Sequence, residues 1–356
     1  MKVIAEAGVN HNGNIDTAIE MVKIASEAGA DVIKFQTFNA NKLASQFAPK
    51  ANYQIKNTNQ NESQLDMLRK LQLTHSEFKE LKLLCEKTNI GFLSTAFDSE
   101  SLDFLVNELG VETLKIPSGE ITNLPFLLEH ANTNKKIILS TGMSDVVEIS
   151  RALGCIAFGY LSENSDKPSI NLFNEVFSSP EGKRILKERL VLLHCTTEYP
   201  AHPESLNLNA IKSMQDTFDL TIGLSDHSEG VYAPLIASAM GAQVIEKHFT
   251  LDKNQSGPDH KASLNPPELK EMISLIKNTR KMYGTGEKKP HKSEKKNKDI
   301  ARKSIVASSN INIGDVFTMQ NLEFKRPGNG IPPYKIWEIL GKTSTKIFSK
   351  DQLIEL

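Results

Sequence analysis

The sequence has 356 residues, enough for one large α/β domain or for such a domain with a small appendage. Its 42 Lys and Arg residues nearly balance 43 Asp and Glu residues, and the formal net charge of −1 argues against a dedicated nucleic-acid-binding protein. Three widely separated cysteines do not suggest a disulfide framework, and no apolar run approaches the roughly 20 residues that span a bilayer. The N-terminal segment reads directly as a strand without a signal peptide, so we expect a cytoplasmic protein.

Short apolar segments alternate with amphipathic helical patterns along most of the chain. The apolar segments are rich in Val, Ile and Leu without regular alternation, as expected for parallel strands covered on both faces. We expect strands at residues 2–8, 31–37, 90–95, 113–119, 136–142, 190–196, 220–226 and 243–249. Helical patterns lie between most of them, and Thr74 and Glu77 have the spacing of a capping box. Eight strand–helix units predict a (β/α)8 TIM barrel, and a doubly wound open sheet is the main alternative.

Two connections are longer than a minimal barrel needs. Residues 38–73 follow the second strand and belong to the catalytic face, where they are expected to act as a lid. Residues 154–189 precede the sixth strand and belong to the opposite face, where we expect packing or assembly and no chemistry.

The periodic pattern ends near Gly284. Residues 284–299 are rich in lysine and lack apolar periodicity, which predicts a solvated linker; polyanion binding is the alternative. Residues 300–356 have short strands and little helix, and they predict a compact β-rich module. The expected organisation is therefore a barrel domain at 1–283, a linker at 284–299 and a small C-terminal domain at 300–356.

Polar residues gather where the predicted strands end, which is where a barrel enzyme places its active site. They are Glu6, Lys34, Gln36, Ser94, Thr95, Lys115, Ser118, Glu120, Ser140, Thr141, His194, Thr196, Thr197, Tyr199, Ser225, Asp226, His227, Glu246, Lys247 and His248. One such residue is explained by the end of a strand, but all eight strands carry them. Lysines inside apolar strands are also costly unless each meets an anion. The pattern predicts a polar catalytic centre.

Lys34 and Lys115 lie among Ser and Thr hydroxyls and glycine-containing turns, a combination that suits a phosphate or a carboxylate. The spacings of a Walker loop and of a dinucleotide-binding fingerprint are absent. A small phosphorylated acid is therefore favoured over a nucleotide.

His227 and His248 end neighbouring strands and are candidates for sharing one divalent metal ion, with Asp226, Glu246 and Asp259 nearby. Two imidazoles with oxygen donors suit Mn²⁺, Co²⁺, Zn²⁺ or Fe²⁺. Glu6 and Glu120 are candidates for binding sugar hydroxyls or moving protons, and Tyr199 is a candidate pocket wall.

These residues belong to motifs that resemble the bacterial sialic acid synthases, which condense phosphoenolpyruvate with an N-acylated mannosamine. The resemblance runs almost end to end and includes "AEAGVNHNG", "GADVIKFQTF", "APKANYQIKNT", "FLSTAFD", "KIPSGEITNLP", "ILSTGM", "HCTTEYP", "GLSDHS", "IEKHFTLDK", "SGPDHKASL" and "KRPGNGI". It implies a TIM barrel with a small C-terminal antifreeze-like (SAF) domain.

The resemblance also implies roles for individual residues. His227 and His248 would bind Mn²⁺ and act in catalysis with Glu6 and Glu120. Phosphoenolpyruvate would be held by Lys34, Thr95, Lys115, Ser118, Ser140, Thr197 and Ser225. The sugar would be bound by Gln36, Tyr199, Asp259 and, from the partner subunit of a domain-swapped homodimer, Arg326. The long segment 154–189 exceeds what most members are expected to have.

The preferred function is N-acetylneuraminate synthase, acting on open-chain N-acetylmannosamine and releasing phosphate. The alternative is N,N'-diacetyllegionaminate synthase, acting on 2,4-diacetamido-2,4,6-trideoxymannose, because these synthases share the same motifs. The "APKANYQIKNT" stretch favours the first sugar. A retro-aldol lyase and a carbohydrate-binding module on an inactive barrel are more remote alternatives.

Overall fold

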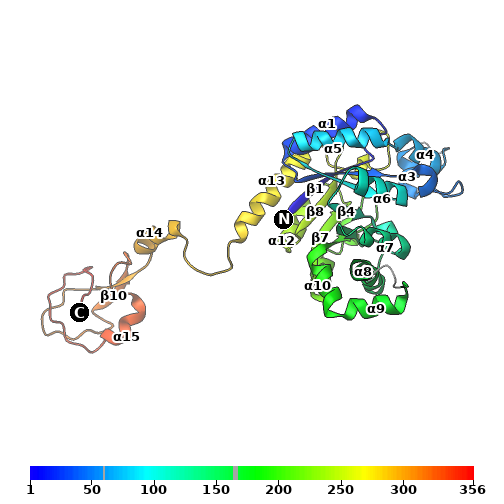
Figure 1. The fold of residues 1–356 in the computed structure, drawn as a ribbon. Helices are drawn as coiled ribbons and strands as arrows, with labels where there is room; N and C mark the ends of the chain where they lie inside the picture. Colours follow the sequence, from blue (N-terminus) through cyan, green and yellow to red (C-terminus); the bar gives the residue numbers. More distant parts are fainter. Residues whose placement is uncertain (59–60, 163–166) are drawn as a thin grey trace. The chain divides into compact units, whose positions relative to one another are not determined.

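The first part of the chain is a closed parallel barrel. The structure, a computed structural model, describes residues 1–58, 61–162 and 167–356 and divides into two compact units, Met1–Tyr283 and Gly284–Leu356. In the first unit, strand β1 is hydrogen-bonded to both β2 and β8, which closes the sheet (Figure 1). The strands are β1 (Lys2–Gly8), β2 (Val32–Thr37), β3 (Gly91–Ala96), β4 (Thr113–Ile116), β5 (Lys136–Ser140), β6 (Leu190–Cys195), β7 (Thr221–Asp226) and β8 (Val244–His248). The predicted barrel is confirmed and the open sheet is excluded.

Helices follow the strands and cover the outside of the barrel. They are α1 (Ile15–Ala28), α5 (His75–Lys87), α6 (Ser99–Asp103) with a π-helical turn (Phe104–Glu108), α7 (Leu124–Asn132), α8 (Val146–Leu161), α11 (Asn209–Phe218), α12 (Tyr232–Ala239) and α13 (Pro266–Tyr283). Helix α1 begins after Asn14, whose side chain accepts from the N–H of Thr17, and ends at Gly29 in the left-handed conformation (φ 83°) that glycine adopts easily. The predicted capping box of Thr74 and Glu77 starts α5. No helix of the described residues is both long enough and apolar enough to cross a membrane.

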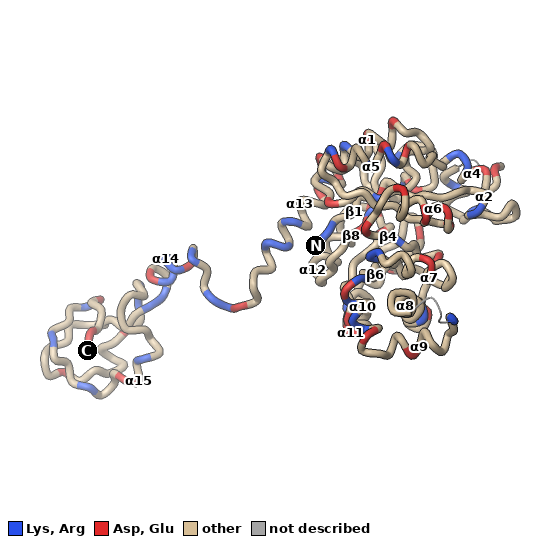
Figure 2. Tube along the Cα trace, viewed as in Figure 1, with Lys and Arg blue, Asp and Glu red and all other residues tan. Residues whose placement is uncertain are grey.

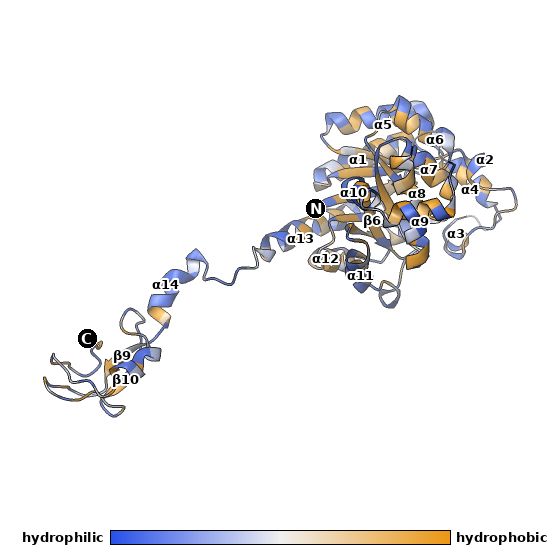
Figure 3. Cartoon of the chain, turned by 60° about the horizontal axis from the view of Figure 1, so that its bottom comes forward, coloured by the Kyte–Doolittle hydropathy of each residue, from blue (hydrophilic) through white to orange (hydrophobic). Residues whose placement is uncertain are grey.

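Two layers of apolar side chains hold the barrel together. The larger core lies between strands and helices, and Figure 3 shows apolar residues concentrated in this unit. A smaller cluster fills the barrel interior, and its buried members are Ile4, Leu93, Ile138, Leu193 and Val244. Because these residues precede the polar ends of their strands, the barrel is packed below and open to ligands at its carboxyl end.

We call the connection from β2 to α5, residues 38–73, the lid after its expected role. Its described part contains helices α2 (Ala40–Leu43), α3 (Asn52–Asn57) and α4 (Gln64–Leu71), and residues 59–60 lie outside the described part. Buried Phe38, Met67 and Leu71 give the lid an apolar cluster of its own, which also includes Val9 from the end of β1. The lid therefore has its own core next to the carboxyl end of the barrel.

The long segment before β6 packs against the outside of the barrel unit. It includes α9 (Ile170–Ser178) and α10 (Pro180–Arg189), and its residues 163–166 lie outside the described part. Phe173 of α9 is buried against Phe158 of α8, with ring centroids 5.3 Å apart. A Cβ atom at Gly154 would lie 2.5 Å from the carbonyl oxygen of Phe173, so glycine permits this close approach. Packing of the described part agrees with the expected structural role.

The second unit contains α14 (Lys292–Ala301), the antiparallel strands β9 (Ser304–Ala307) and β10 (Leu322–Lys325), and α15 (Ile336–Ile339). Its core includes Ile305, Phe317 and Phe348. Helix α14 occupies residues 292–299 of the segment expected to be a solvated linker. It has no buried residue, and its lysines are visible in Figure 2. Its helical pattern was missed because an exposed helix needs no apolar stripe.

One buried histidine makes the barrel sensitive to acid. His130 in α7 is fully buried, its Nδ1–H donates to the carbonyl oxygen of Phe126 at 2.8 Å, and burial lowers the pKa of His130 to about 4. Below pH 6.5 the unfolded chain binds a proton here, whereas the folded chain does not until about pH 4. The free energy of unfolding should therefore fall by roughly 3 kcal/mol as the pH falls through this window.

The variant His130→Gln keeps a hydrogen-bond donor and removes the titration. Urea unfolding followed by circular dichroism between pH 7 and pH 4 should show a shallower loss of stability in His130→Gln than in the wild type. Equal slopes for the two proteins would contradict the assignment.

Candidate active site

A cavity of about 290 Å³ opens at the carboxyl ends of the barrel strands. Most of the residues singled out by the sequence line it: Glu6, Lys34, Gln36, Thr95, Lys115, Ser118, Ser140, Thr197, Tyr199, Ser225, His227, His248 and Asp259. The barrel thus brings together side chains from the ends of all eight predicted strands and from the loops that follow.

Of the barrel residues given a catalytic, metal-binding or substrate-binding role, Glu120 does not line this cavity. Glu120 lies in a 3-10 turn (Ser118–Glu120), and its carboxylate accepts from the side-chain amide of Asn123 at 2.7 Å. Arg326 belongs to the second unit, where it is exposed and its Nε–H donates to the carbonyl oxygen of Ala301 at 3.0 Å. The tight turn separates Glu120 from Ser118, which does face the cavity.

Two lysines and two glutamates form a buried charge network on the cavity floor. Lys34 Nζ lies 2.8 Å from Glu6 Oε1 and 2.9 Å from Glu246 Oε2. Lys115 Nζ is 3.5 Å from Glu246 Oε1 and donates to Ser140 Oγ at 2.8 Å. All four charged side chains are at most 5% exposed. Lys34 is therefore closely paired, whereas Lys115 has a weaker acidic partner and is the cation more available to a bound anion.

The pKa values of the two lysines are shifted in opposite directions because the lysines are paired to different extents. Burial acts to lower the pKa of Lys34, but the carboxylates of Glu246 and Glu6 outweigh burial and raise it. Burial lowers the pKa of Lys115, and the attraction of Glu246 offsets this only in part. An anion placed beside Lys115 would restore the missing stabilisation of its charge.

The pKa values of the two acids Glu6 and Asp259 are shifted in opposite directions. Burial acts to raise the pKa of Glu6, but His248 and Lys34 outweigh burial and hold the pKa well below its usual range. Burial raises the pKa of Asp259. Two carboxyl groups with separated pKa values in one cavity can divide the roles of ionised acceptor and proton donor.

His227 and His248 have the surroundings of metal ligands. Their ring centroids are 5.6 Å apart, and His227 Nδ1–H donates to the carbonyl oxygen of Thr196 at 2.8 Å, so Nε2 is the nitrogen that could bind an ion. Nδ1 of His248 is buried without a hydrogen-bond partner among the described residues. The described part of the chain contains no group of three or more His, Cys, Asp or Glu side chains placed to hold a metal ion. The pair therefore fits an ion whose remaining ligands are oxygens of substrate or water.

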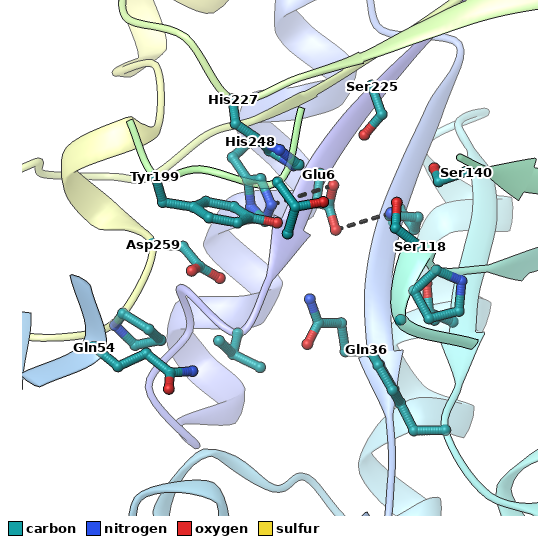
Figure 4. Close-up of a pocket in the computed structure, with 18 of the residues that line it drawn as sticks. Glu6, Gln36, Gln54, Ser118, Ser140, Tyr199, Ser225, His227, His248 and Asp259 are labelled. Atoms are coloured by element: carbon teal, nitrogen blue, oxygen red, sulfur yellow. Dashed lines mark ion pairs between the residues drawn. The ribbon is translucent and has the colours of Figure 1, made fainter. Parts of the chain in front are cut away.

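The lid and an aromatic stack complete the cavity. Tyr53 of α3 stacks on Tyr199 with ring centroids 4.8 Å apart, and Tyr199 lies 4.1 Å from the ring of His227. Figure 4 shows two groups on opposite sides of Glu6, the hydroxyls of Ser118, Ser140 and Ser225 and the polar groups of Gln54, Tyr199 and Asp259. The cavity thus has a hydroxyl-rich side near the lysines and an aromatic and amide side next to the lid.

Sequence reasoning placed Glu246 only beside the candidate metal ligands and gave no individual role to Tyr53 or Gln54. Glu246 joins Lys34, Lys115 and the hydroxyl of Ser225, which donates to it at 2.8 Å. Its two-residue spacing from His248 was a usable signal, because residues i and i+2 of a strand share a face. Tyr53 and Gln54 lie in the "APKANYQIKNT" stretch, which the sequence analysis used only to choose between sugars.

The chain matches the NeuB family over residues 21–288 and the SAF domain over residues 302–355. Since the first match covers most of the sequence, the chain belongs to the NeuB family. The predicted recognition and the predicted enzyme class, a nonulosonic acid synthase among the transferases, are confirmed by this membership and by the relatives.

Several relatives carry names that specify a product. The N,N'-diacetyllegionaminic acid synthase of Campylobacter jejuni is 50% identical over 99% of this chain and 98% of its own length. The N,N'-diacetyllegionaminic acid synthase of Legionella pneumophila is 41% identical over 95% of this chain and 89% of its own length. The N-acetylneuraminate-9-phosphate synthase of Homo sapiens is 30% identical over 99% of this chain and 90% of its own length. Among solved structures, the N-acetylneuraminic acid synthetase of Leptospira borgpetersenii has 32% identity and a TM-score of 0.65, covering 83% of this chain and 89% of that one.

Proposed function

We propose that this protein condenses phosphoenolpyruvate with 2,4-diacetamido-2,4,6-trideoxymannose to form N,N'-diacetyllegionaminic acid and phosphate. The observation that carries the proposal is the 50% identity to the Campylobacter jejuni legionaminic acid synthase along 99% of the chain. The human relative, named for N-acetylneuraminate 9-phosphate, is only 30% identical. The comparisons therefore favour the alternative sugar of the sequence analysis over N-acetylmannosamine, the sugar it preferred.

The two-sided cavity supports a reaction between an anion and a sugar. Phosphoenolpyruvate would lie on the side of Lys115, Ser118 and Ser140, and the sugar on the side of Tyr199 and Asp259. C3 of phosphoenolpyruvate attacks the sugar aldehyde carbon and forms the new carbon–carbon bond. Water then adds at C2, and phosphate leaves by cleavage of its bond to C2.

Glu6 is the residue we assign to the water step. It lies between the two sides of the cavity, and its low pKa keeps it ionised and able to accept a proton. When Lys34 pairs with a bound phosphate or carboxylate, the positive charge that it presents to Glu6 is partly neutralised. The pKa of Glu6 then rises, and Glu6 becomes a stronger base. Glu120, the other acid considered for this step, is outside the cavity.

His227 and His248 would hold the divalent ion, with Mn²⁺ proposed. A bound ion supplies Lewis acid polarisation of the aldehyde oxygen. The contact between His227 Nδ1 and the carbonyl oxygen of Thr196 fixes the ring orientation for this purpose.

Phosphate release from phosphoenolpyruvate tests the proposal. The assay is run with 2,4-diacetamido-2,4,6-trideoxymannose and with N-acetylmannosamine, each with and without Mn²⁺. Manganese-dependent turnover that prefers the trideoxy sugar supports the proposal, whereas preference for N-acetylmannosamine makes the protein an N-acetylneuraminate synthase. A folded, metal-loaded protein that turns over neither sugar but binds carbohydrate would instead favour a binding module on an inactive barrel.

We also propose a domain-swapped homodimer in which Arg326 binds the N-acyl group of the sugar in the partner's barrel. Its exposure supports this role. Arg326→Ala should raise KM for the sugar at least about tenfold with little change in the affinity for phosphoenolpyruvate, since a hydrogen bond to a charged group contributes about 1.5 to 3 kcal/mol. Lys325→Ala is the matched control, and equal loss for both ligands would count against the assignment.

Mixing two defective chains separates a swapped site from an unswapped one. Chains carrying Arg326→Ala are unfolded, mixed and refolded with chains carrying Lys115→Met. In a swapped dimer, the intact barrel of the first chain receives the intact arginine of the second, so activity returns. Activity no higher than that of the separate variants would overturn the swap.

A further inference from the structure

The lid presents an apolar surface to the cavity. Within its cluster, Leu43 of α2 and Met67, Leu68 and Leu71 of α4 line the cavity, and we call these four residues the lid wall. Met67 and Leu71 are buried in the cluster, whereas Leu43 and Leu68 are only half-buried. Apolar surface open to a water-filled cavity is unfavourable until a ligand covers it. The lid wall is therefore suited to an apolar part of a substrate.

The rest of the lid places this surface on the sugar side. Gln54 lies near Asp259, and Tyr53 stacks on Tyr199. Burial raises the pKa of Tyr53, and the negative charge of nearby Asp259 raises it further, so the lid reaches the acid assigned to the sugar. The anion side is made instead by strand-end residues such as Lys115 and Ser140.

The charge of the lid also restricts the substrate. Its described cavity-lining residues are Leu43, Tyr53, Gln54, Gln64, Met67, Leu68 and Leu71, and no Lys or Arg is among them. The lysines of the cavity, Lys34 and Lys115, come from β2 and β4 and are engaged on the floor. A sugar phosphate directed toward the lid wall would meet leucine and methionine side chains in place of a cation.

Resting on the proposed function, we propose that the lid wall determines sugar specificity. It contacts the C6 methyl group and the methyl of the C4 acetamido group of 2,4-diacetamido-2,4,6-trideoxymannose. N-acetylmannosamine carries hydroxyls at both carbons, and these would lose hydrogen bonds to water against Leu43 and Leu68. A hydrophobic pocket discriminates against an added hydroxyl by about 100-fold.

The test substitutes the half-buried members of the lid wall. In Leu43→Asn and Leu68→Asn, the ratio of kcat/KM for the trideoxy sugar to kcat/KM for N-acetylmannosamine should fall at least about tenfold, because the new amide can pair with a hydroxyl and no longer favours a methyl group. KM for phosphoenolpyruvate should be unchanged. Leu65→Asn is the matched control, since Leu65 belongs to the same cluster as both residues and to the same helix as Leu68 but does not line the cavity.

The outcomes distinguish this inference from the proposed function. A wild-type enzyme that uses only N-acetylmannosamine would refute the proposed function and the inference with it. A wild-type preference for the trideoxy sugar that persists unchanged in Leu43→Asn and Leu68→Asn would overturn the inference alone. An equal fall of the ratio in Leu65→Asn would also overturn it, because the effect would then arise from lid packing.

Discussion

Replacing Lys115 by methionine is expected to weaken phosphoenolpyruvate binding about 30-fold or more, because removing one partner of a buried, hydrogen-bonded charge pair costs about 2 to 5 kcal/mol of binding free energy. Lys115 is 2% exposed and lies 3.5 Å from its acidic neighbour, Glu246, so much of its charge is available to a ligand. Glu246 keeps Lys34 at 2.9 Å when Lys115 is lost, and the barrel should remain folded. Titration calorimetry with phosphoenolpyruvate measures the change.

The control is a lysine on a barrel strand that is far from the cavity. Lys136 begins β5 at the amino end of the barrel and is exposed, so Lys136→Met should leave phosphoenolpyruvate binding unchanged. The proposed binding of Mn²⁺ by His227 and His248 should persist in Lys115→Met, because both histidines are untouched. A dissociation constant for Lys115→Met within about threefold of the wild-type value would contradict the anion-binding role.

The barrel was predictable from the sequence because its signals are local and repeat along the chain. Each strand is an apolar run that ends in polar residues, and parallel strands place all those ends at one edge. His227 and His248 could thus be brought together without any knowledge of side-chain positions, and the structure puts both in one cavity.

The sequence could not separate cavity-lining lysines from structural ones without the strand register. Lys34, Lys115 and Lys247 all stand in apolar strands, but Lys247 lies between Glu246 and His248, which face the cavity. Strand alternation therefore turns Lys247 to the outside of the barrel, where its partner is Asp226. The expectation that each buried lysine meets an anion holds, but here that anion is part of the protein.

The lid wall had no local signature. Leu43 and Leu68 are more than twenty residues apart and belong to different helices, and only the packing of their common cluster turns both toward the cavity. Apolar positions in short helices are as typical of core packing as of a ligand-binding surface. Tertiary contacts, which decide between the two, are not encoded in the pattern of either helix alone.

Lys247→Met is expected to lower the free energy of unfolding of the barrel by about 3 to 5 kcal/mol, because it leaves a buried carboxylate without its counter-charge. Lys247 Nζ lies 2.6 Å from Asp226 Oδ2, and both side chains are fully buried. Asp226 also accepts from the backbone N–H and the hydroxyl of Ser228, both at 3.0 Å, but these neutral donors replace only part of the lost charge.

Urea unfolding of the full chain checks this stability difference, and the double variant Asp226→Asn/Lys247→Met shows its cause. With both charges removed, stability should return to within about 2 kcal/mol of the wild type. The single tryptophan, Trp337, lies in the second unit, so circular dichroism must follow the barrel while tryptophan fluorescence follows the other unit. A loss below about 1 kcal/mol in Lys247→Met, or a double variant no more stable than the single one, would show that the buried ion pair does not stabilise the barrel.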